Sequence, residues 1–115
     1  MALHKLRKKR EKIADSDYLA AQIVAHGLNE VLCNIGAPRM YLQSFVREFW
    51  FWSREEPKDE TLKDIFRRLH LLILQNGIHH ISFQEPLVPR FRKIHEELLA
   101  WIRQREQILR QEQKS

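Results

Sequence analysis

Apolar residues recur at the spacing of an α-helix in four segments of the chain, which polar or Gly- and Pro-containing stretches separate. Because these connections are short, the pattern predicts an all-α protein, an antiparallel four-helix bundle. We expect one bundle domain over residues 13–115, with residues 1–12 as a basic N-terminal extension that could continue the first helix. The expected core positions are Leu19 or Ala20, Ile23 or Val24, Leu28, Val31 or Leu32 and Ile35; Leu42, Phe45, Val46, Phe49 and Trp52 or Trp50; Leu62, Ile65, Phe66, Leu69, Leu72 and Ile73; and Phe91, Ile94, Leu98, Trp101 or Ile102, and Ile108 or Leu109.

The segment 38–52, PRMYLQSFVREFWFW, holds most of the aromatic area of the chain. Its four consecutive aromatic residues, 49–52, point in four directions around a helix, so one neighbouring helix cannot bury them all. Either this helix is central and packed on several sides, or Trp50 or Phe51 remains exposed as a protein interface.

Turn and capping residues predict where the helices begin and end. Asp17 suits the first turn of the first helix, where a carboxylate is favourable. The charged segment 53–60 predicts an exposed loop. Thr61 and Asp64 have the spacing of a capping box for the third helix, which Gly77 would end.

Composition is that of an ordinary globular protein, with 43% hydrophobic and 30% charged residues. Cys33 is the single cysteine, which excludes an internal disulfide and fits a reducing compartment, and its position beside the apolar stripe predicts an inert core thiol. No segment has the roughly 18 consecutive apolar residues of a membrane span, and the N-terminus lacks the apolar core of a signal peptide. We therefore expect a cytoplasmic protein without a membrane partner.

The net charge of +5 lies in the N-terminal segment, because the rest of the chain carries equal numbers of basic and acidic side chains. Such a segment is typical of binding to nucleic acid or to an acidic surface, or it adds solubility. Only Leu3, Leu6 and Ile13 could form an apolar face opposite the charges, which disfavours a membrane role. The basic residues concerned are Lys5, Arg7, Lys8, Lys9, Arg10 and Lys12.

No motif for catalysis, a metal or a cofactor is present, so we expect a non-enzymatic protein with no catalytic residue, metal site or cofactor. Six histidines are present, but they lack cysteine or carboxylate partners at ligand spacing, and the side chains of adjacent His79 and His80 diverge. The one spacing that suggests chemistry is R-x4-H at Arg90 and His95, which resembles the motif of HEPN-family ribonucleases, also small helical bundles. That resemblance implies that Arg90 and His95 act on an RNA 2′-hydroxyl and phosphate, usually across a dimer.

Basic residues in the third and fourth helices predict a second cationic surface. If they lie beside the N-terminal segment, they form a positive strip that binds the phosphodiester backbone without reading bases. Alternatively, they pair locally with Asp64, Glu96 and Glu97. The predicted nucleic-acid-binding residues outside the N-terminal segment are Lys63, Arg67, Arg68, Arg90, Arg92 and Lys93.

A short all-helical chain with scattered arginines and no catalytic centre resembles the small subunit of CRISPR effector complexes. The resemblance implies a ribonucleoprotein role in antiviral defence, in which basic side chains hold single-stranded or guide-duplex nucleic acid, DNA or RNA. It also implies contacts with larger subunits or with copies of itself through Trp50 or Phe51.

We therefore expect a non-catalytic small subunit that binds nucleic-acid backbone within a larger assembly. One alternative is a protein-interaction adaptor that docks through the aromatic residues 49–52. The other is the HEPN-like ribonuclease.

Overall fold

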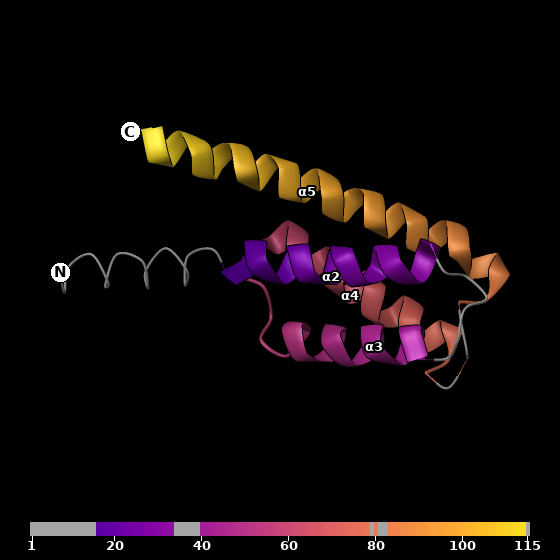
Figure 1. Ribbon diagram of the computed structural model, residues 1–115. Coiled ribbons are helices and arrows are strands. Elements are labelled where there is room, and N and C mark those ends of the chain that lie inside the picture. Colours follow the sequence, from indigo (N-terminus) through magenta and orange to yellow (C-terminus); the bar gives the residue numbers. More distant parts are fainter. Residues whose placement is uncertain (1–15, 34–39, 79, 81–82, 115) are drawn as a thin grey trace.

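The computed structural model describes residues 16–33, 40–78, 80 and 83–114, and it confirms the predicted all-α bundle for them. The helices are α2 (Ser16–Cys33), α3 (Met40–Ser53), α4 (Glu60–Asn76) and α5 (Val88–Lys114), and the short 3-10 helix η1 (Glu85–Leu87) precedes α5 (Figure 1). No strand occurs in these stretches. The basic segment 1–12 lies outside the described residues.

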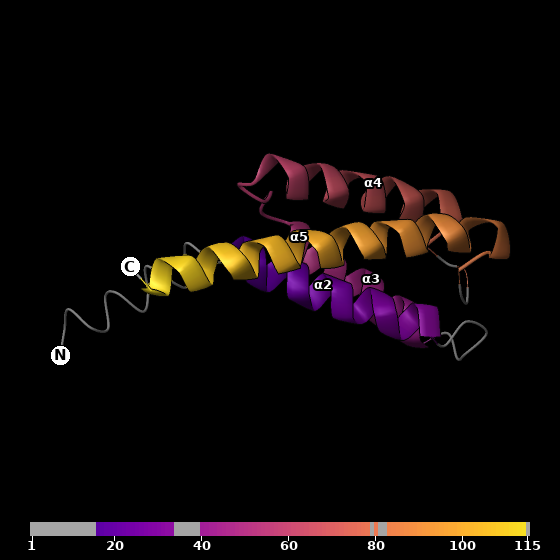
Figure 2. The ribbon, with the colours of Figure 1, turned by 90° about the horizontal axis from the view of Figure 1, so that it is seen from above.

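Successive helices run antiparallel, and α5 spans the length of the molecule (Figure 1). The helix α2 packs against α3 and α5, while α4 packs against α5. Seen from above, α5 lies between α2 and α4 (Figure 2). Side chains close the remaining side of the bundle, where the rings of Phe49 and Phe66 meet edge to face at 5.6 Å between centroids. None of the described helices combines the length and the apolar character needed to cross a membrane.

The predicted core positions of α4 are all buried. For α2 the prediction left Leu19 or Ala20 as the first core position. Ala20, the smaller residue, is the buried one, whereas Leu19 is 47% exposed. Ala21 and Ala25 are buried as well, and these small side chains suit a helix packed against two others. At the far end, the last turns of α5 extend beyond the start of α2 (Figure 1), and Ile108 is 46% exposed.

Close packing of α2 against α3 depends on Gly27, which is buried within α2. A Cβ atom at this position would lie 3.0 Å from Cδ1 of Phe45 and 3.9 Å from a carboxylate oxygen of Glu48. We therefore expect Gly27→Leu to lower the free energy of unfolding by about 2 kcal/mol through overpacking, despite its better helix propensity. Urea unfolding followed by circular dichroism measures the change. Asn29→Leu, on the exposed side of the same helix, is the control, and equal stability of the two variants would contradict the expectation.

The start of α4 differs from the prediction, since its N-cap is Asp59 and not Thr61. The Asp59 carboxylate accepts a hydrogen bond from the backbone N–H of Leu62 at 3.0 Å. The predicted end is confirmed, because Gly77 has φ 95° and donates its N–H to the carbonyls of Ile73 and Leu74.

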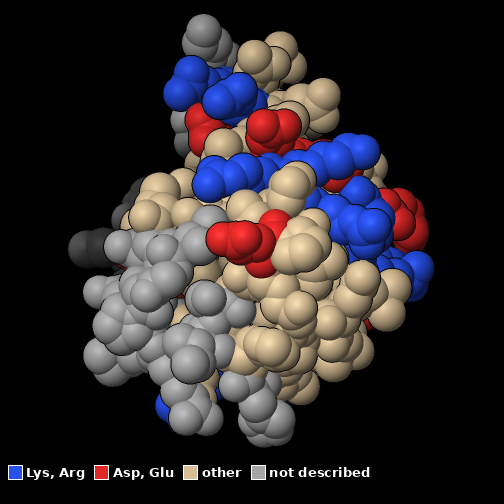
Figure 3. Space-filling view, turned by 90° about the vertical axis from the view of Figure 1, so that its right-hand side faces the viewer, with Lys and Arg blue, Asp and Glu red and all other residues tan. Residues whose placement is uncertain are grey.

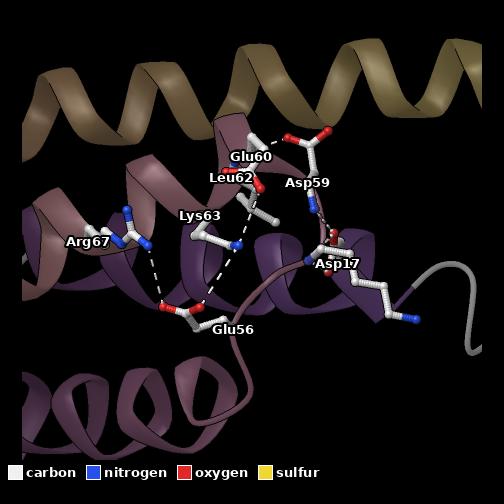
Figure 4. Close-up of polar contacts among 8 residues, drawn as sticks. Asp17, Glu56, Asp59, Glu60, Leu62, Lys63 and Arg67 are labelled. Atoms are coloured by element: carbon white, nitrogen blue, oxygen red, sulfur yellow. Dashed lines mark hydrogen bonds and ion pairs between the residues drawn. The ribbon is translucent and has the colours of Figure 1, made fainter.

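The loop 54–59 is not simply exposed, as we predicted, because a buried carboxylate from α2 anchors it. Asp17 is buried and accepts hydrogen bonds from the backbone N–H of Lys58, at 3.0 and 3.1 Å, and of Asp59, at 2.8 Å (Figure 4). Pro57 in the same loop is also buried. The role of Asp17 is therefore to connect α2 to the start of α4, in addition to its favourable place in the first helical turn.

The same polar chain continues from the start of α4 to α5 through Asp59. The indole N–H of Trp101 donates to the Asp59 carboxylate at 3.0 Å, and the Arg105 guanidinium lies 3.9 Å from it. Burial alone would raise the pKa of Asp59, but hydrogen bonds from Leu62 and Trp101 and the charge of Arg105 outweigh it and hold this pKa below its ordinary value. The carboxylates of Asp17 and Asp59 thus connect α2, α4 and α5.

Candidate functional site

Two of the predicted nucleic-acid-binding residues, Lys63 and Arg67, lie beside carboxylates. The ammonium group of Lys63 is 3.4 Å from a Glu60 oxygen and 3.9 Å from a Glu56 oxygen. Glu56 also lies 3.7 Å from the Arg67 guanidinium, between the two cations (Figure 4). Their charge is therefore largely balanced on the surface of α4.

Arg68 is the most fully paired of the predicted residues. Its Nη1 and Nη2 atoms donate to the two carboxylate oxygens of Glu97 on α5 at 2.7 and 2.8 Å, and its Nε donates to Asp64 at 3.0 Å. The hydrogen bond from Arg68 lowers the pKa of Glu97, and the pair raises the pKa of Arg68 in turn. Arg68 therefore shows the local pairing with Asp64 and Glu97 that was the alternative to a phosphate-binding strip. Lys63 and Arg67 are paired as well, but with Glu56 and Glu60, which were not among the predicted partners.

The three basic residues at the start of α5 differ, because Arg90, Arg92 and Lys93 are exposed and none has a salt bridge within the described residues. Arg90 and Lys93 face α4, where they line a groove together with Arg68. Arg92 lies about 200° around the helix from Arg90 and does not line this groove. Arg92 therefore does not share the groove with Arg90 and Lys93. Figure 3 shows this end of the molecule, where Lys and Arg side chains form a band with acidic residues among them.

The groove between α4 and α5 has a volume of ≈ 320 Å³. Leu71, Leu72 and Ile94 supply its apolar walls, and Gln75 lies among them. The three cations Arg68, Arg90 and Lys93 complete the lining, in which none of the described residues is aromatic. An apolar floor bordered by basic groups is suited to an amphipathic, anionic ligand.

Two leucines on the outward side of α4 are exposed, and one of them, Leu71, also lines this groove. Leu71 is 64% exposed and Leu74 is 47% exposed, and residues three apart are neighbours on a helix surface. Leu71 also borders a second hollow of ≈ 320 Å³ against the end of α3, whose walls include Phe49, Phe66 and His70. We call the exposed residues Arg67, Leu71, Leu74 and Gln75 the α4 face. This face was not predicted; its signal in the sequence is that Leu71 and Leu74 both lie off the core stripe of α4.

The aromatic run at the end of α3 is mostly packed within the bundle. Phe49 is fully buried, and Trp50 is half-buried with its ring 4.4 Å from that of His70. Phe51 is 61% exposed, and the Arg54 guanidinium lies 5.7 Å from its ring centroid. Of the two residues predicted as an interface, Phe51 alone presents most of its surface to solvent.

Arg90 and His95, the pair that resembles the ribonuclease motif, lie on different sides of α5. Arg90 borders the groove toward α4, whereas His95 borders a hollow of ≈ 530 Å³ toward α2, with His26, Gln22 and Asn29 among its walls. Five residues of a straight helix turn the second side chain by about 140°, and α5 brings the pair no closer within one chain. Among the described residues, no three side chains of His, Cys, Asp or Glu gather as a metal site. Cys33 is exposed, so the expectation of a core thiol was wrong; it ends α2 on the solvent side.

His95 is expected to make the stability of the fold depend on pH. Burial between α5 and α2 lowers the pKa of His95 below its usual value near 6.5, although a hydrogen bond to the backbone of Ala25 opposes the shift. The unfolded chain therefore binds a proton at a higher pH than the folded chain does, and stability falls as the pH drops below about 6.5. We expect the thermal midpoint to fall less between pH 7.5 and about 5.5 in His95→Gln than in the wild type. Parallel pH profiles would contradict this role.

Comparison with models of known protein families, with curated proteins and with solved structures finds no match to this chain.

Proposed function

We propose that this protein is a non-catalytic adaptor subunit that docks a partner protein through the α4 face and the adjoining α4–α5 groove. The observation that carries the proposal is the exposure of two neighbouring leucines on α4, Leu71 and Leu74, of which Leu71 also lines the α4–α5 groove. Side chains of this kind lose water-exposed apolar area only when a partner covers them, and contiguous exposed apolar patches mark interaction sites. This proposal keeps the adaptor function that was predicted from residues 49–52. It assigns the docking to the α4 face instead of to those residues of α3.

The test is the size of the native complex in extracts of cells that produce the protein, for a wild-type chain and three tagged variants. Leu74→Asp places a charge in the proposed interface and is expected to shift the protein to the size of a free monomer. Leu19→Asp is a matched control, because Leu19 on α2 is also 47% exposed. Phe51→Asp tests the aromatic alternative. A complex that survives Leu74→Asp, or that is lost equally in Leu19→Asp, would overturn the proposal.

Binding of nucleic-acid backbone is the second candidate function. It is supported by the concentration of the net charge in residues 1–12 and by the absence of a salt bridge at Arg90, Arg92 and Lys93 within the described part of the chain. A ribonucleoprotein complex of the CRISPR type, in which a small helical subunit contacts both protein and nucleic acid, would use both surfaces.

Fluorescent single strands of DNA and RNA, titrated at two salt concentrations, test this second candidate. Binding that weakens steeply with salt is expected, and it should be lost on deletion of residues 1–12. In the full chain, replacing Arg90, Arg92 and Lys93 by glutamine should weaken the binding. Replacing Lys63 and Arg67, which already have carboxylate partners, should change it little. Affinity that does not depend on salt would contradict backbone binding.

A further inference from the structure

We propose that the partner element at this surface is an acidic amphipathic α-helix that lies along the α4–α5 groove. Its apolar side would contact Leu71, Leu74 and the groove walls, and its carboxylates would face Arg90 and Lys93. This inference rests on the proposed adaptor function and adds the chemistry of the partner to it.

The shape of the site favours a helix as the ligand. The groove runs between two antiparallel helices, and the apolar part of its lining is the aliphatic side chains Leu71, Leu72 and Ile94. A partner helix can place residues at i, i+3 or i+4, and i+7 into such a groove. Leu74, next to Leu71 on α4, extends the apolar contact beyond the groove.

The charges around the groove favour a partner with negative charge. Arg90 and Lys93 are exposed, and neither forms a salt bridge within the described part of the chain. Arg68 is already paired with Glu97 and Asp64, and the charge of Lys93 also lowers the pKa of Glu97. The groove with these carboxylates therefore holds three basic and two acidic side chains. A modest positive surplus calls for one or two carboxylates on the partner, not for a polyanion.

Two other occupants fit this site less well. Sites for single-stranded nucleic acid combine cations with aromatic side chains on which bases stack, whereas the described lining of this groove offers cations and aliphatic side chains without an aromatic ring. A second copy of the chain, docked by two-fold symmetry, would bring the same surface against itself. With the two-fold axis near Arg90 and Lys93, the same cations of the two copies would meet, which is electrostatically unfavourable.

A displayed library of helical peptides about 18 residues long, five turns of helix, tests the inference on the full chain. The library holds the apolar positions at helical spacing and varies the flanking positions among Glu, Lys, Gln and Ala. Peptides that bind the wild type and are lost on Leu71→Asp should be enriched in Glu on one flank. A pool that is basic or neutral, or that binds Leu71→Asp equally well, would overturn the inference.

A charge reversal sharpens the test. In the double variant Arg90→Glu, Lys93→Glu, selection should change from Glu-rich to Lys-rich peptides, and the affinity of a Glu-rich peptide should fall at least tenfold. The double variant Arg103→Glu, Arg110→Glu applies the same charge change farther along α5 and should leave the selection unchanged. Circular dichroism checks that both variants fold. Unchanged peptide preference after the first reversal would refute the role of Arg90 and Lys93.

These outcomes separate the inference from the proposed function. If Leu74→Asp dissolves the native complex but the selected peptides show no acidic preference, the adaptor function stands and the acidic helix is wrong. If wild-type chain at high concentration forms a dimer that Leu71→Asp abolishes, the occupant is a second copy. If a labelled oligothymidylate competes with the selected peptide, the groove is a nucleic-acid site.

Discussion

Replacing Asp17 by alanine is expected to lower the free energy of unfolding by about 3 kcal/mol, a large effect for one polar side chain. The buried carboxylate accepts hydrogen bonds from the backbone N–H groups of Lys58 and Asp59. Without it, two polar groups at the start of α4 lose their partner, and each such loss costs about 1–3 kcal/mol. The change would also loosen Asp59, which caps α4 and binds Trp101.

Urea unfolding of Asp17→Ala and of three further variants measures this effect. Asp17→Asn retains one acceptor oxygen and is expected to fall between the wild type and Asp17→Ala. Trp101→Leu removes the indole donor to Asp59 together with ring packing, and Arg105→Gln removes only the nearby charge. A stability change of Asp17→Ala within about 0.5 kcal/mol, the usual range for a surface substitution, would show that the loop needs no anchor.

Replacing Phe49 by alanine is expected to lower the free energy of unfolding by about 4 kcal/mol. Phe49 is fully buried, and its ring lies 6.2 Å from that of Phe45, 5.6 Å from Phe66 and 5.6 Å from Trp50. It joins α3 to α4 on the side of the bundle where side chains, more than close backbone packing, close the core. Its loss would leave a cavity at that junction.

Phe51→Ala is the matched control from the same aromatic run. Phe51 is 61% exposed, and its removal should cost less than about 1 kcal/mol. Chemical unfolding of both variants gives the comparison directly. Similar losses of stability would contradict the burial of Phe49 and the exposure of Phe51.

The sequence predicted the fold where a helix has one apolar stripe. In α4 the spacing from Leu62 to Ile73 leaves a single choice, and every predicted position is buried. In α2, Leu19 and Ala20 both fit the period, and the answer depends on how closely α3 and α5 approach. That distance depends on the tertiary structure, so the apolar pattern alone could not decide which of the two residues is buried.

The groove, and the polar contacts that hold the helices together, were harder to predict because the residues that form them come from distant parts of the chain. Asp17 fits the first turn of a helix locally, but its hydrogen-bond partners lie 41 and 42 residues away. Arg68 was predicted to bind phosphate, whereas its main partner is Glu97, 29 residues further on. Whether a cation is free or paired is decided by which helices become neighbours, and composition does not record that.

The most direct test of the docking surface is photo-cross-linking from position 74 within the native complex. A photoreactive phenylalanine analogue replaces Leu74 in one chain and Leu19, equally exposed on α2, in another. We predict a covalent adduct of discrete mass from position 74 and none from position 19. Adducts from both positions, or from position 19 alone, would contradict a docking surface on α4.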